Sequence, residues 1–253
     1  MSELELHRAL TWAMFGLGAV TAIALLLVTA PYGRHARTGW GATTSARTGW
    51  IVMELPAVVV FALVYAAGAH RASAMPLAFL AIWQVHYVYR ALIYPLRLGP
   101  RATPMPWSIA LSGFAFNVLN AYLNARWISQ LGDYADASPR DPWFLAGVLV
   151  FFTGLLVNRA ADRALFRLRG ASGERRYAIP RGALFARVSC PNYLGEIVQW
   201  FGWALLTCSL PGLAFACYTL ANLGPRALKH HAWYRATFPD YPPERKALIP
   251  FLG

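Results

Sequence analysis

The sequence predicts an all-α, polytopic membrane protein with seven transmembrane helices. Hydrophobic residues make up 57% of the 253 residues and charged residues only 13%, whereas soluble domains contain about 25% charged residues. The apolar residues also gather in long windows that contain few charges, as helices of about 20 residues that cross a bilayer require. This composition excludes a disordered chain, and three cysteines are too few for a small disulfide scaffold.

Each predicted span is a window of low charge. Windows 9–33 and 102–125 contain no Asp, Glu, Lys or Arg, and windows 48–70 and 72–96 contain one each, Glu54 and Arg90. Window 143–158 is uncharged and begins just after a proline. Window 188–228 is too long for one helix, and the sequence Ser-Leu-Pro-Gly at 209–212 breaks it, so we expect two spans there.

The distribution of basic residues predicts the orientation. Of the 23 Lys and Arg residues, 18 lie in four segments, 31–48, 97–106, 159–188 and 224–253. With an odd number of spans, this pattern places the N-terminus outside and the C-terminus in the cytoplasm. We attribute the net charge of +12 to these loops and expect no nucleic-acid partner. Because the loops are short, residues 1–253 should form a single transmembrane domain.

Polar residues inside the second and third spans are the first functional candidates, since ionisable groups in lipid are costly. Glu54 lies about one turn inside the second span, and Tyr87, Arg90 and Tyr94 share one face of the third. A protonated Glu54 could donate a hydrogen bond, which a carboxylate cannot. Two alternatives stay open: Glu54 pairs with a loop arginine at the interface, or Tyr87 and Tyr94 belong to an aromatic belt.

Further polar stripes lie near the cytoplasmic ends of the later spans. Each repeats at helical spacing: Asn158, Asp162 and Arg169; Asn192, Glu196 and Gln199; Arg226, His230 and Tyr234. With Arg101 and the basic 159–188 loop they predict a cationic pocket for a phosphorylated cofactor. Lipid-headgroup binding would account for the arginines but not for the other polar residues. Asn117, Asn120 and Asn124 form another stripe, for which simple hydrogen bonding between helices is an equal alternative.

Standard cofactor and metal motifs are missing. Residues 16–21 only approach the dinucleotide fingerprint and lie inside a predicted helix with no strand before them. Any dinucleotide must therefore be held by helices. Cys190, Cys208 and Cys217 fall in or beside the last two spans, where we expect small packing residues rather than a disulfide or a metal site.

The C-terminal half resembles the steroid 5α-reductase family. The resemblance rests on segment 189–197 (Ser-Cys-Pro-Asn-Tyr-Leu-Gly-Glu-Ile), on Arg226 with the His230–His231 pair, and on the tail from Asp240 to Phe251. Earlier matches are Tyr32-Gly33, Glu54-Leu55-Pro56, His86-Tyr87 with Arg90, and Tyr177-Ala178-Ile179-Pro180. Glu54 together with Tyr87 points to the steroid branch proper.

The resemblance implies seven transmembrane helices and an NADPH-dependent 3-oxo-5α-steroid 4-dehydrogenase that reduces the C4–C5 double bond of 3-oxo-Δ4 steroids. Glu54 and Tyr87 would hold the 3-keto oxygen. The cofactor contacts would be Arg101, Asn158, Asp162, Arg169, Tyr177, Asn192, Glu196, Arg226, His230 and Tyr234. Chain length and orientation favour a bacterial member in the inner membrane, with membrane lipids as its surroundings. Met53 departs from the Gln of familiar animal members and leaves the choice of steroid open.

The chemistry fits the residues independently of the resemblance. Hydride addition to the β-carbon of an enone places negative charge on the ketone oxygen, and hydrogen-bond donors in a water-poor site stabilise that charge. Three rival functions are related sterol or enoyl reductases, a methyltransferase of the isoprenylcysteine type that uses S-adenosylmethionine, and a non-catalytic sterol-binding protein. The methyltransferases share a similar Pro-x-Tyr-x-Gly segment, but they usually carry paired Glu residues where this chain has His230 and His231.

Overall fold

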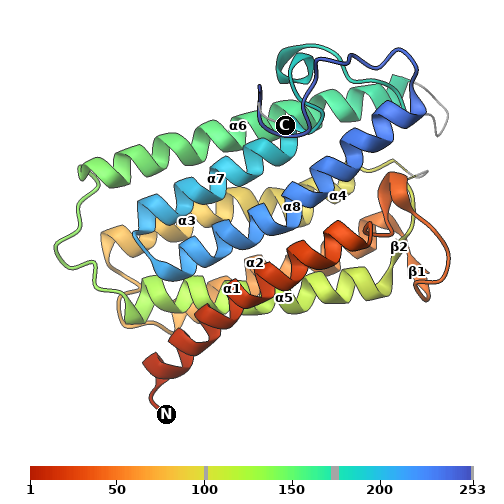
Figure 1. The fold of residues 1–253 in the computed structure, drawn as a ribbon. Helices are drawn as coiled ribbons and strands as arrows, with labels where there is room; N and C mark the ends of the chain where they lie inside the picture. Colours follow the sequence, from red (N-terminus) through yellow and green to blue (C-terminus); the bar gives the residue numbers. More distant parts are fainter. Residues whose placement is uncertain (100–101, 172–176, 252–253) are drawn as a thin grey trace. The chain divides into compact units, whose positions relative to one another are not determined.

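A computed structural model describes residues 1–99, 102–171 and 177–251. Every predicted window contains a long helix (Figure 1). These helices are α1 (Glu3–Leu27), α2 (Ala46–Ala66), α3 (Ala74–Val88), α5 (Trp107–Arg126), α6 (Pro142–Ala171), α7 (Pro191–Thr207) and α8 (Leu210–Thr237). A π-helical stretch, Tyr89–Ile93, joins α3 to the short α4 (Tyr94–Leu96), and strands β1 (Thr43–Thr44) and β2 (Met105–Pro106) pair antiparallel.

The chain is therefore mostly helical, as predicted, with one short pair of strands that the prediction did not include, and three helices support the membrane assignment. Helices α1 and α2 and residues Pro142–Leu168 of α6 are long and apolar enough to cross a bilayer. The chain is accordingly an integral membrane protein. The count of seven spans, the orientation of the termini and the single domain over residues 1–253 stay predictions.

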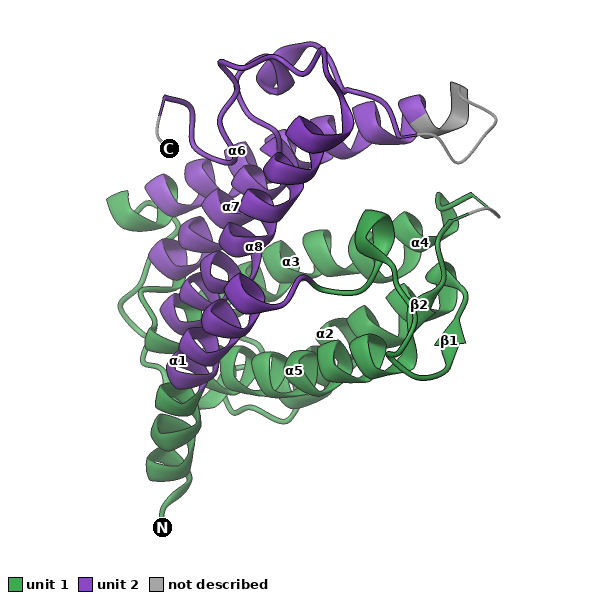
Figure 2. Cartoon of the chain, turned by 45° about the vertical axis from the view of Figure 1, so that its right-hand side comes forward, with its two compact units in different colours: residues 1–13, 30–145, 207–212 green, residues 14–29, 146–206, 213–253 purple. Residues whose placement is uncertain are grey.

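Contacts divide the chain into two compact units (Figure 2). Unit 1 comprises Met1–Ala13, Ala30–Leu145 and Thr207–Gly212, and unit 2 comprises Met14–Thr29, Ala146–Leu206 and Leu213–Gly253. Each unit is built from segments far apart in the sequence. Helix α1, for example, is divided near its middle, so that its first turns belong to unit 1 and the rest to unit 2.

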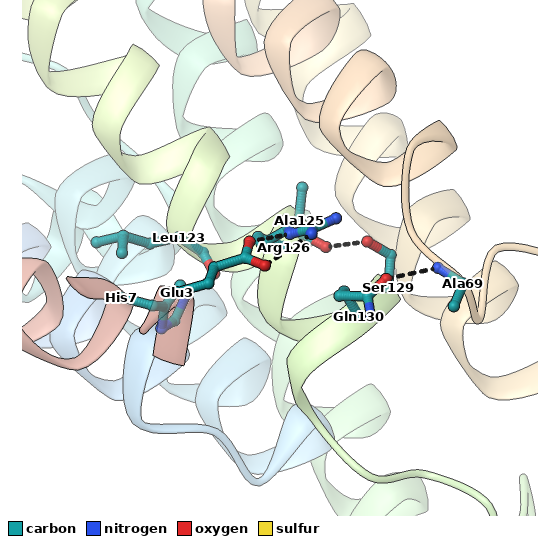
Figure 3. Close-up of polar contacts among 8 residues, drawn as sticks. All are labelled: Glu3, His7, Ala69, Leu123, Ala125, Arg126, Ser129 and Gln130. Atoms are coloured by element: carbon teal, nitrogen blue, oxygen red, sulfur yellow. Dashed lines mark hydrogen bonds and ion pairs between the residues drawn. The ribbon is translucent and has the colours of Figure 1, made fainter. Parts of the chain in front are cut away.

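In unit 1, the first turns of α1 are fastened to the end of α5 (Figure 3). Arg126 makes two hydrogen bonds to the carboxylate of Glu3, and His7 Nε2 donates to the carbonyl oxygen of Leu123 at 2.9 Å. Farther along α5, Asn117 donates to the backbone oxygen of Met53 on α2 at 2.8 Å, whereas Asn124 donates to Asn120 one turn away at 2.9 Å. The asparagine stripe thus contributes hydrogen bonds both between helices and within α5.

In unit 2, four glycines bring α6 and α7 into direct backbone contact. Gly147 and Gly154 lie on α6, and Gly195 and Gly202 lie on α7. A Cβ added at Gly154 would lie 2.4 Å from the backbone nitrogen of Gln199, and one added at Gly195 would lie 2.5 Å from that of Asn158. Only glycine permits this approach, which sets Asn158 opposite the start of α7.

Candidate functional site

Glu54 in unit 1 is buried and held at both carboxyl oxygens. Arg90 Nε lies 3.4 Å from Glu54 Oε1, and Asn117 Nδ2 donates to Oε2 at 3.3 Å. Helix α2 supplies Glu54, α5 supplies Asn117 and the π-helical stretch supplies Arg90. One partner of Glu54 is thus an arginine of the third predicted span.

Arg90 is also enclosed by aromatic rings. Its guanidinium carbon lies 4.6 Å from the ring centre of Trp50 and 5.0 Å from that of Tyr94. Cation–π contacts at these distances hold a guanidinium in place. The π-helical turn that carries Arg90 is a form frequently found at functional sites.

Tyr87 faces the interior of unit 1. It is 3% exposed, and its ring lies 4.7 Å from that of Trp83. Trp83 in turn stacks on Phe61 at 4.4 Å and donates its indole N–H to the carbonyl oxygen of Ala57 at 2.8 Å. Such burial is not that of a belt residue at the membrane surface. Glu54 and Tyr87 therefore both belong to the interior of one unit.

A second polar cluster lies in unit 2, where α6 meets the start of α7. Asn158 Nδ2 donates to the backbone oxygen of Asn192 at 2.9 Å and to Glu196 Oε2 at 3.3 Å. Asn192 Nδ2 donates to Asp162 Oδ1 at 3.4 Å. Two predicted stripes are thus brought together. The side-chain oxygen of Asn158 is buried without a hydrogen-bond partner among the described residues, so it fits a ligand that brings N–H or O–H donors, as a dinucleotide does.

The stripe on α8 meets a residue that we did not single out from the sequence. The hydroxyl oxygen of Tyr193 accepts from Arg226 at 3.0 Å and lies 3.0 Å from His230 Nε2. The guanidinium of Arg226 also lies over the Tyr193 ring, 5.3 Å from its centre. Tyr193 lies between Asn192 and Glu196 in the sequence. Its hydroxyl, beside two predicted cofactor contacts, could have identified it as a candidate from the sequence. The guanidinium of Arg226 is thus held in a fixed orientation, as is expected of an arginine that binds a phosphate.

Two of the remaining predicted cofactor contacts, Tyr234 and Tyr177, pack against other aromatic rings. Tyr234 is buried and stacks on Tyr241 of the tail, with ring centres 5.2 Å apart, and Tyr177 packs edge-on against Trp233 at 5.3 Å. Arg101 lies outside the described residues, and the side chain of Arg169 is likewise not described.

Hydrogen bonds around the Ser189 hydroxyl anchor the C-terminal tail beside the start of α7. Ser189 Oγ lies 2.6 Å from His231 Nδ1 and 2.6 Å from the Tyr241 hydroxyl. The backbone N–H of Ser189 donates to the carbonyl oxygen of Lys246 at 2.8 Å, and that of Lys246 donates to Arg187 at 3.0 Å. His231 lies beyond the first 20 or so residues of α8, about the length that a bilayer would cover. Its pKa is lowered by burial and then by the charges of Arg235 and Lys246.

Comparison with known proteins gives a consistent result. The family model of 3-oxo-5-alpha-steroid 4-dehydrogenases matches residues 103–252. A steroid 5-alpha-reductase of Arabidopsis thaliana is 43% identical over 93% of this chain and 92% of its own length. The 3-oxo-5-alpha-steroid 4-dehydrogenase 1 of Bos taurus is 41% identical over 100% of this chain and 99% of its own, and that of Homo sapiens is 39% identical over 100% and 97%. The relatives named here are plant and animal proteins, so a bacterial origin stays a prediction. The chain belongs to the steroid 5α-reductase (3-oxo-5α-steroid 4-dehydrogenase) family.

Proposed function

We propose that this protein reduces the C4–C5 double bond of 3-oxo-Δ4 steroids with NADPH. The observation that carries the proposal is identity of about two residues in five with 3-oxo-5-alpha-steroid 4-dehydrogenases over the whole chain (41% with the Bos taurus protein). The buried Glu54, which Arg90 and Asn117 hold in place, supports it, because a ketone oxygen that gains charge needs hydrogen-bond donors in a water-poor site. NADPH, when bound, supplies the hydride.

Glu54 and Tyr87 donate hydrogen bonds to the 3-keto oxygen in this proposal. Glu54 must then carry a proton, as does the neutral carboxylic acid that donates to the oxyanion in ketosteroid isomerase. Trp50 and Tyr94 retain the guanidinium of Arg90 by cation–π contact while Glu54 is neutral. Asn117 keeps the Glu54 side chain oriented through its bonds to Glu54 and to the Met53 carbonyl. Both donors act most strongly on the enolate that forms as the β-carbon receives the hydride.

The polar residues of unit 2 hold the cofactor in this proposal. Asn158, Asn192 and Glu196 form a preorganised hydrogen-bonding surface, and Tyr193 directs Arg226 toward a phosphate. Asp162, His230, Tyr177 and Tyr234, together with Arg101 and Arg169, complete the proposed contacts. The N-terminus would lie outside and the C-terminus in the cytoplasm of a bacterial cell, where NADPH is available.

The test is an incubation of purified protein with a panel of 3-oxo-Δ4 steroids. Parallel samples contain NADPH, NADH or S-adenosylmethionine, and the mass of each product is measured. We expect a product that carries two additional hydrogens, formed with NADPH. Methylated product from S-adenosylmethionine, or no reduction of any steroid, would overturn the proposal.

A further inference from the structure

Helix α6 exposes one continuous stripe of side chains. The exposed positions alternate three and four residues apart, which keeps them on one face: Ala146, Leu149, Thr153, Leu156, Ala160, Arg163 and Arg167. The stripe is uncharged as far as Ala160 and basic from Arg163 onward. Two of its leucines are more than 60% exposed, as is expected for side chains that face lipid tails.

The length of this stripe matches the thickness of a bilayer. Trp143, at the start of α6, is 48% exposed, and tryptophan is enriched where membranes meet water. Arg163 lies about 20 residues further along the helix, a rise of about 30 Å. The hydrocarbon core of a bilayer is about 30 Å thick. Trp143 and Arg163 therefore mark its two boundaries on this helix.

We propose that Arg163 and Arg167 bind the phosphate of an anionic membrane lipid at this boundary. The two guanidinium groups are exposed and one helical turn apart, and neither pairs with a carboxylate in the described part of the chain. A guanidinium donates two parallel hydrogen bonds to a phosphate, and a lipid at this depth presents its phosphate to both arginines.

This contact would set the depth of the polar cluster of unit 2. Asp162 is adjacent to Arg163 in sequence but is buried on the inner side of α6, and Asn158 lies one turn earlier. A lipid phosphate held by Arg163 keeps these inward-facing residues level with the headgroups. The inference rests on membrane insertion of α6 and not on the proposed steroid activity.

A lipid titration of the purified full chain in neutral detergent tests the proposal. The probe is phosphatidylglycerol, with phosphatidylcholine and inorganic phosphate as separate arms, and binding is followed by native mass spectrometry. The R163Q/R167Q double variant is compared with R181Q/R187Q, which removes the same charge from exposed positions of the same unit.

We expect wild type and R181Q/R187Q to bind phosphatidylglycerol alike and R163Q/R167Q to bind it about 25-fold more weakly, since each arginine near an anionic surface contributes about fivefold. R163K/R167K, which keeps both charges but loses the paired guanidinium hydrogen bonds, should bind more weakly than wild type and more tightly than R163Q/R167Q, and it controls for a folding defect. Equal losses in both glutamine variants, no loss in R163Q/R167Q, or displacement of the lipid by inorganic phosphate would each overturn the proposal.

Discussion

Glu54 is the residue whose surroundings bear most directly on the chemistry. A carboxyl group fixed by Arg90 and Asn117 cannot rotate away from its position without losing both contacts. Preorganisation of this kind makes an oxyanion donor effective, because no reorganisation is needed during the reaction.

Glu54→Gln should lower turnover roughly 10²–10³ fold, the usual cost of removing one oxyanion donor. Gln retains an amide N–H, so some activity should persist. NADPH binding, measured by fluorescence titration, should be unchanged because Glu54 is not among the proposed cofactor contacts. Turnover close to that of wild type would contradict the assigned role.

Tyr87→Phe should lower kcat more than it raises KM. In the proposed mechanism the hydroxyl contacts an oxygen that gains charge only as hydride arrives, so its loss should raise the energy of the transition state. Single-turnover oxidation of NADPH at saturating steroid measures the step. Tyr65→Phe is a matched control, because Tyr65 is equally buried and its hydroxyl donates to the Arg71 carbonyl instead. Equal single-turnover rates in the two variants would show that the Tyr87 hydroxyl has no role in the chemistry.

Tyr193→Phe should weaken NADPH binding by about tenfold or more, because a hydrogen bond to a charged group contributes about 1.5–3 kcal/mol. Phe retains the ring beneath Arg226 but not the oxygen that directs it. Arg226→Ala should cost at least as much, and the double variant should cost little more than Arg226→Ala alone. Strict additivity in a titration of the three variants would show that Tyr193 does not act through Arg226.

At the scale of elements, the glycine contact between α6 and α7 positions the residues proposed to bind the cofactor. Gly154→Ala should lower the free energy of unfolding by about 1–3 kcal/mol, because its Cβ would meet backbone atoms that cannot move aside. Gly16→Ala on α1 is the matched control, since a Cβ there has nothing within 4 Å. That substitution should stabilise its helix by up to about 1 kcal/mol. Thermal unfolding of the two variants should therefore shift in opposite directions, and a shift in the same direction would contradict this account of the packing.

The tail cluster predicts a pH dependence. The pKa of His231 is lowered from 6.5 in the folded state, so the unfolded state binds more protons below that value. The contribution of His231 to stability is complete above pH 6.5 and is lost as the pH falls through the lowered folded-state pKa. The protection factors of amides 245–248, which compare hydrogen exchange with the intrinsic rate at each pH, should fall between pH 7 and pH 5 in wild type, and less so in His231→Gln. An identical pH dependence in the two proteins would assign the effect to another group.

At the scale of the whole molecule, the sequence predicted the helices better than their ends. Windows of low charge located the seven long helices of the described residues, but α1 begins at Glu3 and not at residue 9. Acidic residues are stable in the first turn of a helix although they do not enter lipid. At the opposite end of a helix basic residues are stable, and α6 accordingly continues to Ala171, well past the uncharged window that ends at residue 158. A window of low charge predicts the membrane part of a helix and not the helix itself.

Residues of the candidate site could be predicted where they repeat on one face of a helix. Contacts between residues of distant segments could not be predicted. Asn158 with Asp162, and Asn192 with Glu196, could be found from their spacing. The pairing of Arg90 with Glu54, and that of Ser189 with His231 and Tyr241, depend on how each helix is rotated about its axis. Single-sequence periodicity gives the polar face of a helix but not the partner that this face meets.

The central claim is hydride transfer from NADPH to the β-carbon of a steroid enone. The most direct measurement uses NADPH that carries deuterium in the transferable position at C4 of the nicotinamide, with a 3-oxo-Δ4 steroid and the purified protein in ordinary water. Nuclear magnetic resonance then locates the label in the product. We predict one deuterium at C5 and an unlabelled solvent-derived hydrogen at C4. A reduced product without deuterium, or with deuterium at C4, would contradict the account.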